Sequence, residues 1–393
     1  MLALIDFIRR NSEDSKRIVA LDGIRVLLVL VVAWFHIWQQ SWLSPHFVFN
    51  GRYFDMDYIL RSGYLWVDGL LLLSGFLLYL PYASAEHSSL PAILPFYKKR
   101  FFRIVPSCYL CIFLLLFSIL ISGKYIKTSG ALSLDFLLHL GFLQTFNIDS
   151  YYNTLFNPVL WTLAIEMQFY LIFPFIARFF RKSPVICYIC MALGAYLFRL
   201  YALSKQDVSM LFNQLPAFLD VYANGFLGAC IYVELKKLLR ARSKSIEIFM
   251  SVCFFLSLLA LLSIAYKQAM LSDVLMIRRG QINNRFILSV YMSVFIISAC
   301  FSLRGIRFLL GNRLMRYLSD ISFQFYIWHI IVLHFFLKRR IPFSRFKMPN
   351  VAMDYAWQVK FSLLCFFATL VIASLVHYLF EKPILRSAGL VKD

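Results

Sequence analysis

The chain has 393 residues, of which 61% are hydrophobic and only 15% are charged. Soluble globular domains have about 45–50% apolar and about 25% charged residues, so this composition excludes an ordinary soluble enzyme. The net charge is +20, but the Lys and Arg residues lie in short clusters between apolar runs, as in membrane loops rather than in nucleic-acid-binding surfaces. We therefore expect a polytopic protein that contacts membrane lipids and binds no nucleic acid.

Ten apolar runs are long enough to cross a bilayer, which takes about 20 residues in a helix. The segment 131–147 is shorter and carries Asp135 and His139, so we expect it to be re-entrant or interfacial. The predicted fold class is an all-α integral membrane bundle of ten transmembrane helices. The predicted spans lie near residues 18–40, 60–82, 104–122, 159–177, 183–203, 210–235, 246–266, 286–303, 316–337 and 361–380.

The charges of the loops predict the orientation of these spans. A cluster of Lys and Arg residues precedes the first span, which places the N-terminus in the cytoplasm, and ten spans return the C-terminus to the same side. We expect a cytoplasmic N-terminal segment 1–17, one transmembrane domain 18–386 and a cytoplasmic tail 387–393. The predicted location is the cytoplasmic (inner) membrane of a bacterium, and the basic loop 338–347 would then lie on the outer side.

The first span, "LDGIRVLLVLVVAWFHIW" (21–38), contains Arg25 and His36. A charged Arg at the bilayer centre costs at least ~2.5–3.5 kcal/mol, so such residues often mark functional sites. The two residues are 11 positions apart, which is about three turns and roughly 16 Å along one helix face. Arg25 is expected in the cytoplasmic half of the span and His36 in the outer half. The structural alternatives are a hydrogen-bonded interior histidine and a snorkelling Arg25 paired with Asp22.

The fourth span begins near Trp161 and carries Glu166 about one and a half turns deeper, roughly 7 Å. His36 lies a similar distance below the outer end of its own span. We predict that Glu166 and His36 lie at similar depth and form an acid/base pair, with an ion pair that braces two helices as the structural alternative. Asp68 in the second span and His329 in the ninth are further candidates that face the bundle interior.

The stretch "FYKKRFFRIVP" places Arg100 and Arg103 within one turn, where the third span enters from the cytoplasm. Two forked guanidiniums suit a phosphate-bearing ligand, and the alternative is anchoring to lipid headgroups. The CxxC pairs have no further Cys or His at ligand spacing, so no metal site is expected. Signatures such as GxSxG, HExxH and the Walker loop are absent from the sequence.

Six motifs together resemble the acyltransferase-3 family of integral membrane O-acyltransferases. They are LDGIR…H, "VDGLLLLSGFLL", "RFFRIVP", "WTLAIEMQFYLIFP", "ISFQFYIWH" and "FEKPI", and in order and spacing they cover residues 17 to 386. Members of this family move acyl groups, commonly acetyl from acetyl-CoA, onto cell-envelope glycans. The resemblance is to the stand-alone form, without a fused esterase-like domain.

The resemblance also implies roles for individual residues. Arg25 and His36 match the essential Arg–x10–His of the family, and Arg100 with Arg103 matches its RxxR. The implied catalytic residues are His36, Glu166 and Arg25, and the implied donor-binding residues are Arg100, Arg103 and Arg25. The implied substrate-binding or supporting residues are Asp68, Trp161, His329, Ser322 and Glu381.

The reaction implied by the resemblance uses acyl-CoA as a donor substrate and needs no bound cofactor. The donor docks from the cytoplasm, and His36 acts as a general base on an acceptor hydroxyl or first carries the acyl group itself. The expected acceptor is a glycan or lipid-linked glycan at the cell surface, such as lipopolysaccharide O-antigen or exopolysaccharide. Thr162 stands where the family usually has Ser, and Leu70-Leu71 where it has Phe-Phe, so the acyl and acceptor preferences stay open.

Two other functions fit a polytopic bundle with intramembrane charges. A secondary transporter of an anionic solute or of an acylated glycan intermediate would also bury Arg, His and Glu. Transporters ordinarily show inverted repeats or paired broken helices, which this sequence does not display. A membrane-bound O-acyltransferase of a different fold is the enzymatic alternative, and the terminal E-x-P and the RxxR favour the acyltransferase-3 family over it.

Overall fold

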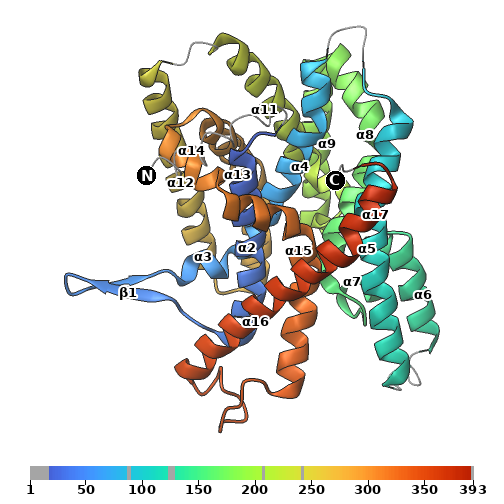
Figure 1. The fold of residues 1–393 in the computed structure, drawn as a ribbon, viewed down its shortest axis with the longest axis vertical. Coiled ribbons are helices and arrows are strands. Elements are labelled where there is room, and N and C mark those ends of the chain that lie inside the picture. The colour runs from blue at the N-terminus through green and yellow to red at the C-terminus, as the bar shows by residue number, and fades with distance from the viewer. Residues whose placement is uncertain (1–16, 86–89, 123–128, 206–208, 240–242, 391–393) are drawn as a thin grey trace.

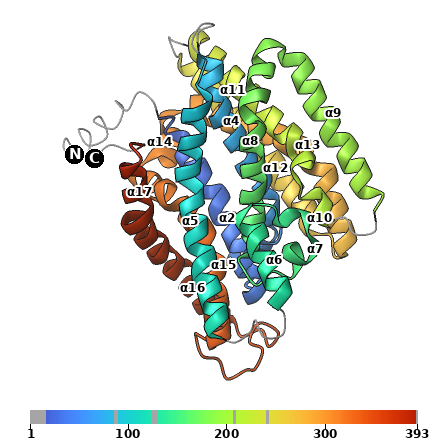
Figure 2. The same cartoon turned by 90° about the vertical axis from the view of Figure 1, so that its right-hand side faces the viewer.

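The computed structural model describes residues 17–85, 90–122, 129–205, 209–239 and 243–390. Within these ranges, ten helices are long and apolar enough to cross a membrane, which confirms the predicted all-α bundle. They pack into one body in which α2, α4 and α15 lie near the centre (Figures 1 and 2). The ten helices are α2 (Ala20–Ser41), α4 (Trp66–Ser84), α5 (Ile93–Ile121), α8 (Trp161–Lys182), α9 (Pro184–Leu203), α11 (Leu219–Leu238), α12 (Lys244–Ala269), α13 (Val274–Phe301), α15 (Arg313–Arg339) and α16 (Tyr355–Val376).

Shorter elements connect or extend these helices. The strands β1 and β2 form an antiparallel hairpin that projects from the bundle (Figure 1), and the chain ends with a turn of π-helix, η7, followed by α17. The shorter elements are β1 (His46–Phe49), β2 (Arg52–Asp55), α3 (Asp57–Arg61), η2 (Gly63–Leu65), α6 (Ser129–Leu140), η4 (Gln144–Phe146), α7 (Ile148–Tyr152), η5 (Pro158–Leu160), α10 (Ser209–Phe212), η6 (Leu215–Phe218), α14 (Arg304–Gly311), η7 (His377–Glu381) and α17 (Lys382–Ser387).

The segment predicted to be re-entrant or interfacial contains a helix that is too short to cross a bilayer. Its helix α6 has 12 residues, about 18 Å at 1.5 Å per residue, which is shorter than the ~30 Å hydrocarbon core. The Thr154 hydroxyl donates a hydrogen bond to Asp135 of α6 at 2.8 Å, which ties the helix to the segment after α7. Asp135 therefore has a structural partner.

Two helices begin a dozen or so residues earlier than the hydropathy predicted. Helix α5 begins at Ile93 instead of near residue 104, and α13 begins at Val274 instead of near residue 286. In both cases the apolar run is preceded by Lys or Arg residues, which lower the hydropathy but are good helix formers. The helix therefore continues past the apolar boundary, and Arg100 and Arg103 lie inside α5 rather than at its start.

An even number of crossings brings both described ends of the chain to one face of the bundle. Arg17 and Leu390, the first and last described residues, line the same cavity. We call this the terminal face. The hairpin β1–β2 and the loop 340–354 lie at the other end of the bundle, which we call the opposite face. Helix α2 begins at the terminal face, so His36 lies near the opposite face.

Helices α4 and α11 approach each other closely at the centre of the bundle. A Cβ atom on Gly225 of α11 would lie 2.6 Å from the Leu72 carbonyl oxygen, and one on Gly75 would lie 3.1 Å from that of Tyr222. Small residues allow this close packing in membranes, where van der Waals contact drives helix association. Gly75 and Gly225 therefore permit the close approach of the two helices.

Two buried ion pairs fasten the helices around this centre. Asp68 of α4 accepts a hydrogen bond from Arg285 of α13 at 3.0 Å, and Asp220 of α11 pairs with Arg199 of α9 at 2.6 Å. Both arginines also donate to the Ala217 carbonyl oxygen, at 3.5 and 3.1 Å. Asp68 is therefore a structural residue that joins two helices, and it does not line the cavity described below.

Removing one partner of the Asp68–Arg285 pair should destabilise the protein. An Asp68→Ala change leaves a guanidinium buried without its counter-charge, and breaking a buried pair in this way costs about 3–5 kcal/mol. Thermal unfolding of the purified full-length protein in detergent measures this loss. The matched control is Glu234→Ala, which removes an exposed ion pair with Lys237 and should cost about 0.2–1 kcal/mol. Equal losses in the two variants would contradict the structural role.

Candidate functional site

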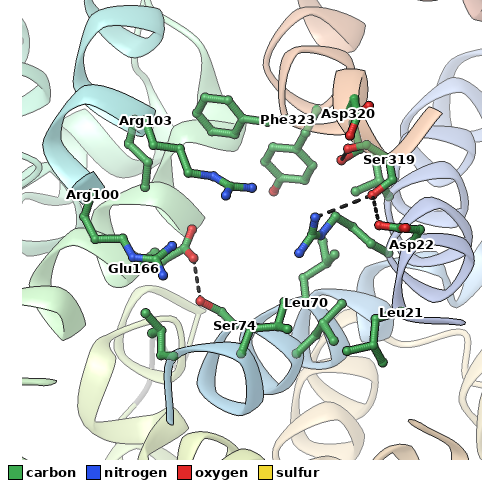
Figure 3. A pocket seen from close by; sticks show the side chains of 18 of the residues that line it. Leu21, Asp22, Leu70, Ser74, Arg100, Arg103, Glu166, Ser319, Asp320 and Phe323 are labelled. Carbon is green, nitrogen blue, oxygen red and sulfur yellow. Dashed lines mark hydrogen bonds between the residues drawn. The ribbon is translucent and has the colours of Figure 1, made fainter. Parts of the chain in front are cut away.

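A cavity of about 990 Å³ opens into the bundle among α2, α4, α5, α8, α15 and the last helical segment, by which we mean η7 and α17. Figure 3 shows Arg100 and Arg103 on one side of the open space and Asp22 and Ser319 on the other, with Ser74 bonded to Glu166. The cavity extends from the terminal face, where Lys99 and Leu390 line it, to a deep end lined by Val67 of α4 and Thr162 of α8. It reaches into the membrane-spanning part of the bundle.

Positively charged side chains dominate the polar lining of this cavity. Arg17 forms ion pairs with Asp22 at 2.8 Å and with Asp320 at 2.9 Å. The other cations that line it have no carboxylate partner among the described residues. They are Arg25, Lys99, Arg100, Arg103 and Lys382. A cavity with unpaired cations suits a ligand that carries several negative charges.

Arg25 is held by a serine rather than by a carboxylate. Its guanidinium lies 3.5 Å from the Ser319 hydroxyl of α15, and that hydroxyl donates to Asp22 at 3.0 Å. The structural alternative had paired Asp22 with Arg25. In the structure Asp22 forms its ion pair with Arg17 instead. The positive charge of Arg25 is thus directed to the cavity without a direct counter-charge.

Arg100 and Arg103 line the same cavity, as expected for residues one helical turn apart. The Arg100 guanidinium lies 5.4 Å from the ring centroid of Tyr170 and 5.7 Å from that of Phe96, within the range of cation–π contact. Its Nε atom is buried and has no hydrogen-bond partner among the described residues. A buried donor without a partner is costly, and a phosphate oxygen in the cavity would satisfy it.

Glu166 also faces the cavity, but its partners differ from the predicted one. Its Oε1 atom accepts hydrogen bonds from the Ser74 hydroxyl at 2.6 Å and from the Tyr170 hydroxyl at 2.5 Å. His36 contacts Gln39 instead, with its Nδ1 atom 3.1 Å from Oε1 of that residue. The structure therefore does not form the predicted Glu166–His36 acid/base pair.

Two hydrogen-bonded hydroxyl groups line the deep end of the cavity. The Thr162 hydroxyl donates to the Val159 carbonyl at 3.0 Å, so the Tyr326 hydroxyl, 2.9 Å away, is the donor to Thr162. Tyr326 comes from α15, and both residues line the cavity. Sequence reasoning did not select Tyr326, although it lies one turn before His329 on the same helix.

A pair of histidines lies next to Tyr326, outside the cavity lining. The ring centroids of His36 and His329 are 5.3 Å apart, and neither residue lines the cavity. His329 is fully buried; its Nδ1 donates to the Tyr326 carbonyl at 2.7 Å, and its Nε2 has no partner among the described residues. The structure thus brings His36 and His329, two residues of the predicted set, together. Tyr326, which is bonded to His329, lines the cavity.

The remaining predicted residues have supporting positions. Ser322 lines the cavity and donates to the Ser319 carbonyl at 2.7 Å. Trp161 begins α8 and packs against Phe218, with ring centroids 6.4 Å apart. Glu381 lines the cavity from η7, where it is buried.

The last helical segment contributes more to the cavity than the sequence indicated. Besides Glu381, the residues His377, Tyr378 and Lys382 line the cavity. Figures 1 and 2 show α17 beside α5, and the two helices are in contact. Only Glu381 had been selected from the sequence, because the E-x-P resemblance singles out that residue and Pro383.

Known proteins with similar sequences are named as O-acetyltransferases. The O-acetyltransferase OatA of Staphylococcus aureus is 28% identical over 181 residues, which is 44% of this chain and 27% of that protein. The peptidoglycan O-acetyltransferase OatA of Listeria monocytogenes is 27% identical over 182 residues, 44% of this chain and 26% of that protein. The putative peptidoglycan O-acetyltransferase YrhL of Bacillus subtilis is 28% identical over 171 residues, 42% of this chain and 24% of that protein.

These matches cover about a quarter of the length of the curated relatives. No solved structure matches the chain at a significant level. The family match is much longer than the relatives' matches and includes the helices that build the cavity up to η7. The chain belongs to the acyltransferase-3 family, whose model of an acyltransferase domain matches residues 18–377.

Proposed function

We propose that this protein is a membrane O-acyltransferase that moves an acyl group, most simply acetyl, from cytoplasmic acyl-CoA to a hydroxyl of a cell-surface glycan. The observation that carries the proposal is a cation-lined cavity next to a histidine pair. Tyr326 lines the deep end of this cavity, and its carbonyl accepts a hydrogen bond from His329, which contacts His36. Membership of the acyltransferase-3 family supports acyl transfer. The names of the relatives support acetyl as the acyl group.

The donor site is the cavity at the terminal face. The positive-inside rule favours the cytoplasm for this face, which is where acyl-CoA is available. The guanidiniums of Arg100, Arg103 and Arg25 would bind the phosphates, because arginine forks match phosphate oxygens in geometry and charge. The pantetheine arm would then extend along α4 toward Thr162 and Tyr326 at the deep end.

The acceptor hydroxyl would arrive from the opposite face, near His36. Donation from His36 Nδ1 to Gln39 leaves the lone pair on Nε2 free to accept the hydroxyl proton. The hydroxyl oxygen attacks the thioester carbonyl, a C–O bond forms, the C–S bond breaks, and CoA leaves with the sulfur. His36 can alternatively carry the acyl group transiently. In that route its Nε2 attacks the thioester carbonyl, an N–C bond forms and the C–S bond breaks. The acceptor hydroxyl then attacks the acyl-imidazole, so that the C–O bond forms and the N–C bond breaks.

The names of the relatives add one glycan to the acceptors expected from the sequence. Two of them are named after peptidoglycan. Peptidoglycan therefore joins lipopolysaccharide O-antigen and exopolysaccharide among the acceptors to be tested. Mass spectrometry of envelope glycans from cells with and without the gene would identify which glycan loses its acyl ester.

Replacing the cavity arginines should weaken donor binding. An Arg100→Gln change removes a charge-assisted hydrogen bond worth about 1.5–3 kcal/mol, so the affinity for CoA should fall about 10- to 100-fold. Isothermal titration of CoA into the full-length protein in nanodiscs measures this change. Lys236→Gln, an exposed residue outside the cavity, is the matched control and should bind CoA normally. Unchanged affinity in the Arg100 variant would contradict the donor site.

Replacing His36 should abolish transfer without affecting donor binding. General-base help is worth about 10²–10⁴-fold, so His36→Ala should lower the rate of acceptor acylation by that factor. Incubation with radiolabelled acetyl-CoA without acceptor, followed by mass spectrometry of the peptide that contains His36, distinguishes the two routes. A trapped acyl-histidine supports the covalent route. Full acceptor acylation by His36→Ala would show that this histidine has no part in the reaction.

A further inference from the structure

The rim of the cavity contains an aromatic ring and an ammonium group on the last helical segment. Tyr378 belongs to the π turn η7, and Lys382 begins α17 one turn later. Both line the cavity, and the Lys382 Nζ atom lies 5.4 Å from the Tyr378 ring centroid. Turns of π-helix inserted in α-helices occur frequently at functional sites. Nothing in the proposed reaction has yet used either side chain.

The π turn is fastened to two walls of the cavity. The buried carboxylate of Glu381 accepts hydrogen bonds from Gln324 of α15 at 2.8 Å and from His377 at 2.9 Å. Gln324 also donates to Ser107 of α5 at 2.8 Å. Gln324 and His377 satisfy the Glu381 carboxylate, and among the described residues Lys382 forms no ion pair with it. The network holds the segment in place while Tyr378 and Lys382 face the open space.

Tyr378 and Lys382 are both available to a ligand. Tyr378 is 44% exposed. Lys382 is half-buried and has no carboxylate partner among the described residues. An aromatic face can stack on a nucleotide base, and an ammonium group binds phosphate as a point charge. Together the two groups fit a phosphorylated nucleoside.

The unpaired cations of the cavity come from different elements. Arg100 and Arg103 lie within α5, whereas Lys382 lies on the rim, on a helix that contacts α5. Coenzyme A likewise has two separate anionic groups. Its diphosphate precedes the pantetheine arm, and its 3′-phosphate, with about −1.5 to −2 charge, lies at the nucleoside end. A donor that points its thioester to the deep end would bring the nucleoside to the rim.

We propose that Tyr378 and Lys382 bind the 3′-phosphoadenosine end of the donor, with Tyr378 stacked on the adenine and Lys382 paired with the 3′-phosphate. The donor is then a nucleotide thioester and not a phosphopantetheine carried by a protein. This inference rests on the proposed function, since it assigns the part of the cavity that the arginines leave free.

Binding of three unacylated compounds tests the assignment without any transfer step. CoA, 3′-dephospho-CoA and 4′-phosphopantetheine are titrated into the full-length protein in phosphatidylcholine nanodiscs. The wild type should bind CoA about tenfold more tightly than dephospho-CoA, and Lys382→Gln should lose this preference by weakening CoA alone. Lys382→Arg should keep the preference. Lys360→Gln is the matched control: this exposed lysine belongs to α16, near the other end of the continuous helical run Tyr355–Ser387.

The tyrosine is tested with the same compounds. Tyr378→Leu should weaken CoA and dephospho-CoA together by about fivefold or more and leave phosphopantetheine unchanged, whereas Tyr378→Phe should bind like the wild type. Equal weakening of CoA and dephospho-CoA by Lys382→Gln, or no weakening, would overturn the assignment of Lys382. Equal binding of CoA and phosphopantetheine by the wild type would overturn the whole inference, while acyl transfer from phosphopantetheine would remain possible. A wild type that binds none of the three would overturn the donor proposal as well.

Discussion

A charged side chain inside a bilayer needs a partner, and the arginines of this bundle differ in whether the protein supplies one. Arg285 and Arg199 are buried against Asp68 and Asp220, and they join helices. Arg25 and Arg100 have no carboxylate partner among the described residues and face a cavity. Because leaving such cations unpaired is costly, the second group indicates a ligand, whereas the first group indicates a scaffold. This division separates the residues that hold the bundle together from those that line the cavity.

The scaffold determines where the chemistry can take place. The close contact of α4 with α11 and the buried ion pairs fix one side of α4, and its other side lines the cavity with Ser74 toward Glu166. The Thr162 and Tyr326 hydroxyls then separate the cavity from His36 and His329. This arrangement gives a cation-lined cavity at the terminal face and a histidine pair toward the opposite face. The proposed transfer across the membrane would use this arrangement, because each substrate would reach the reacting atoms from its own side.

The sequence predicted the parts of this arrangement that depend on one helix at a time. Hydropathy and loop charge gave ten spans, and the 11-residue spacing placed Arg25 and His36 at different depths of α2. The partners of these residues depend on how helices rotate and pack against one another, which one sequence does not encode in any local pattern. Glu166 was therefore assigned to His36, although it bonds to Ser74 and Tyr170.

Tyr326 was missed for the same reason, because its partner Thr162 lies on another helix. Tyr378 and Lys382 were missed for a further reason. Tyrosine and lysine near a helix end are common in membrane proteins as interface anchors, so nothing in their local sequence distinguishes them. The π turn at η7 changes which side chains face the cavity, and hydrophobic periodicity does not predict it. The family resemblance identified Glu381 but not its neighbours Tyr378 and Lys382.

The central claim is that an acyl group enters from the terminal face and leaves at the opposite face. Sealed membrane vesicles of known orientation, loaded with the acceptor glycan, allow radiolabelled acetyl-CoA to be supplied to one face at a time. We expect labelled glycan on the opposite face only when the donor is supplied to the terminal face. Equal labelling when the donor is supplied to the opposite face would contradict it.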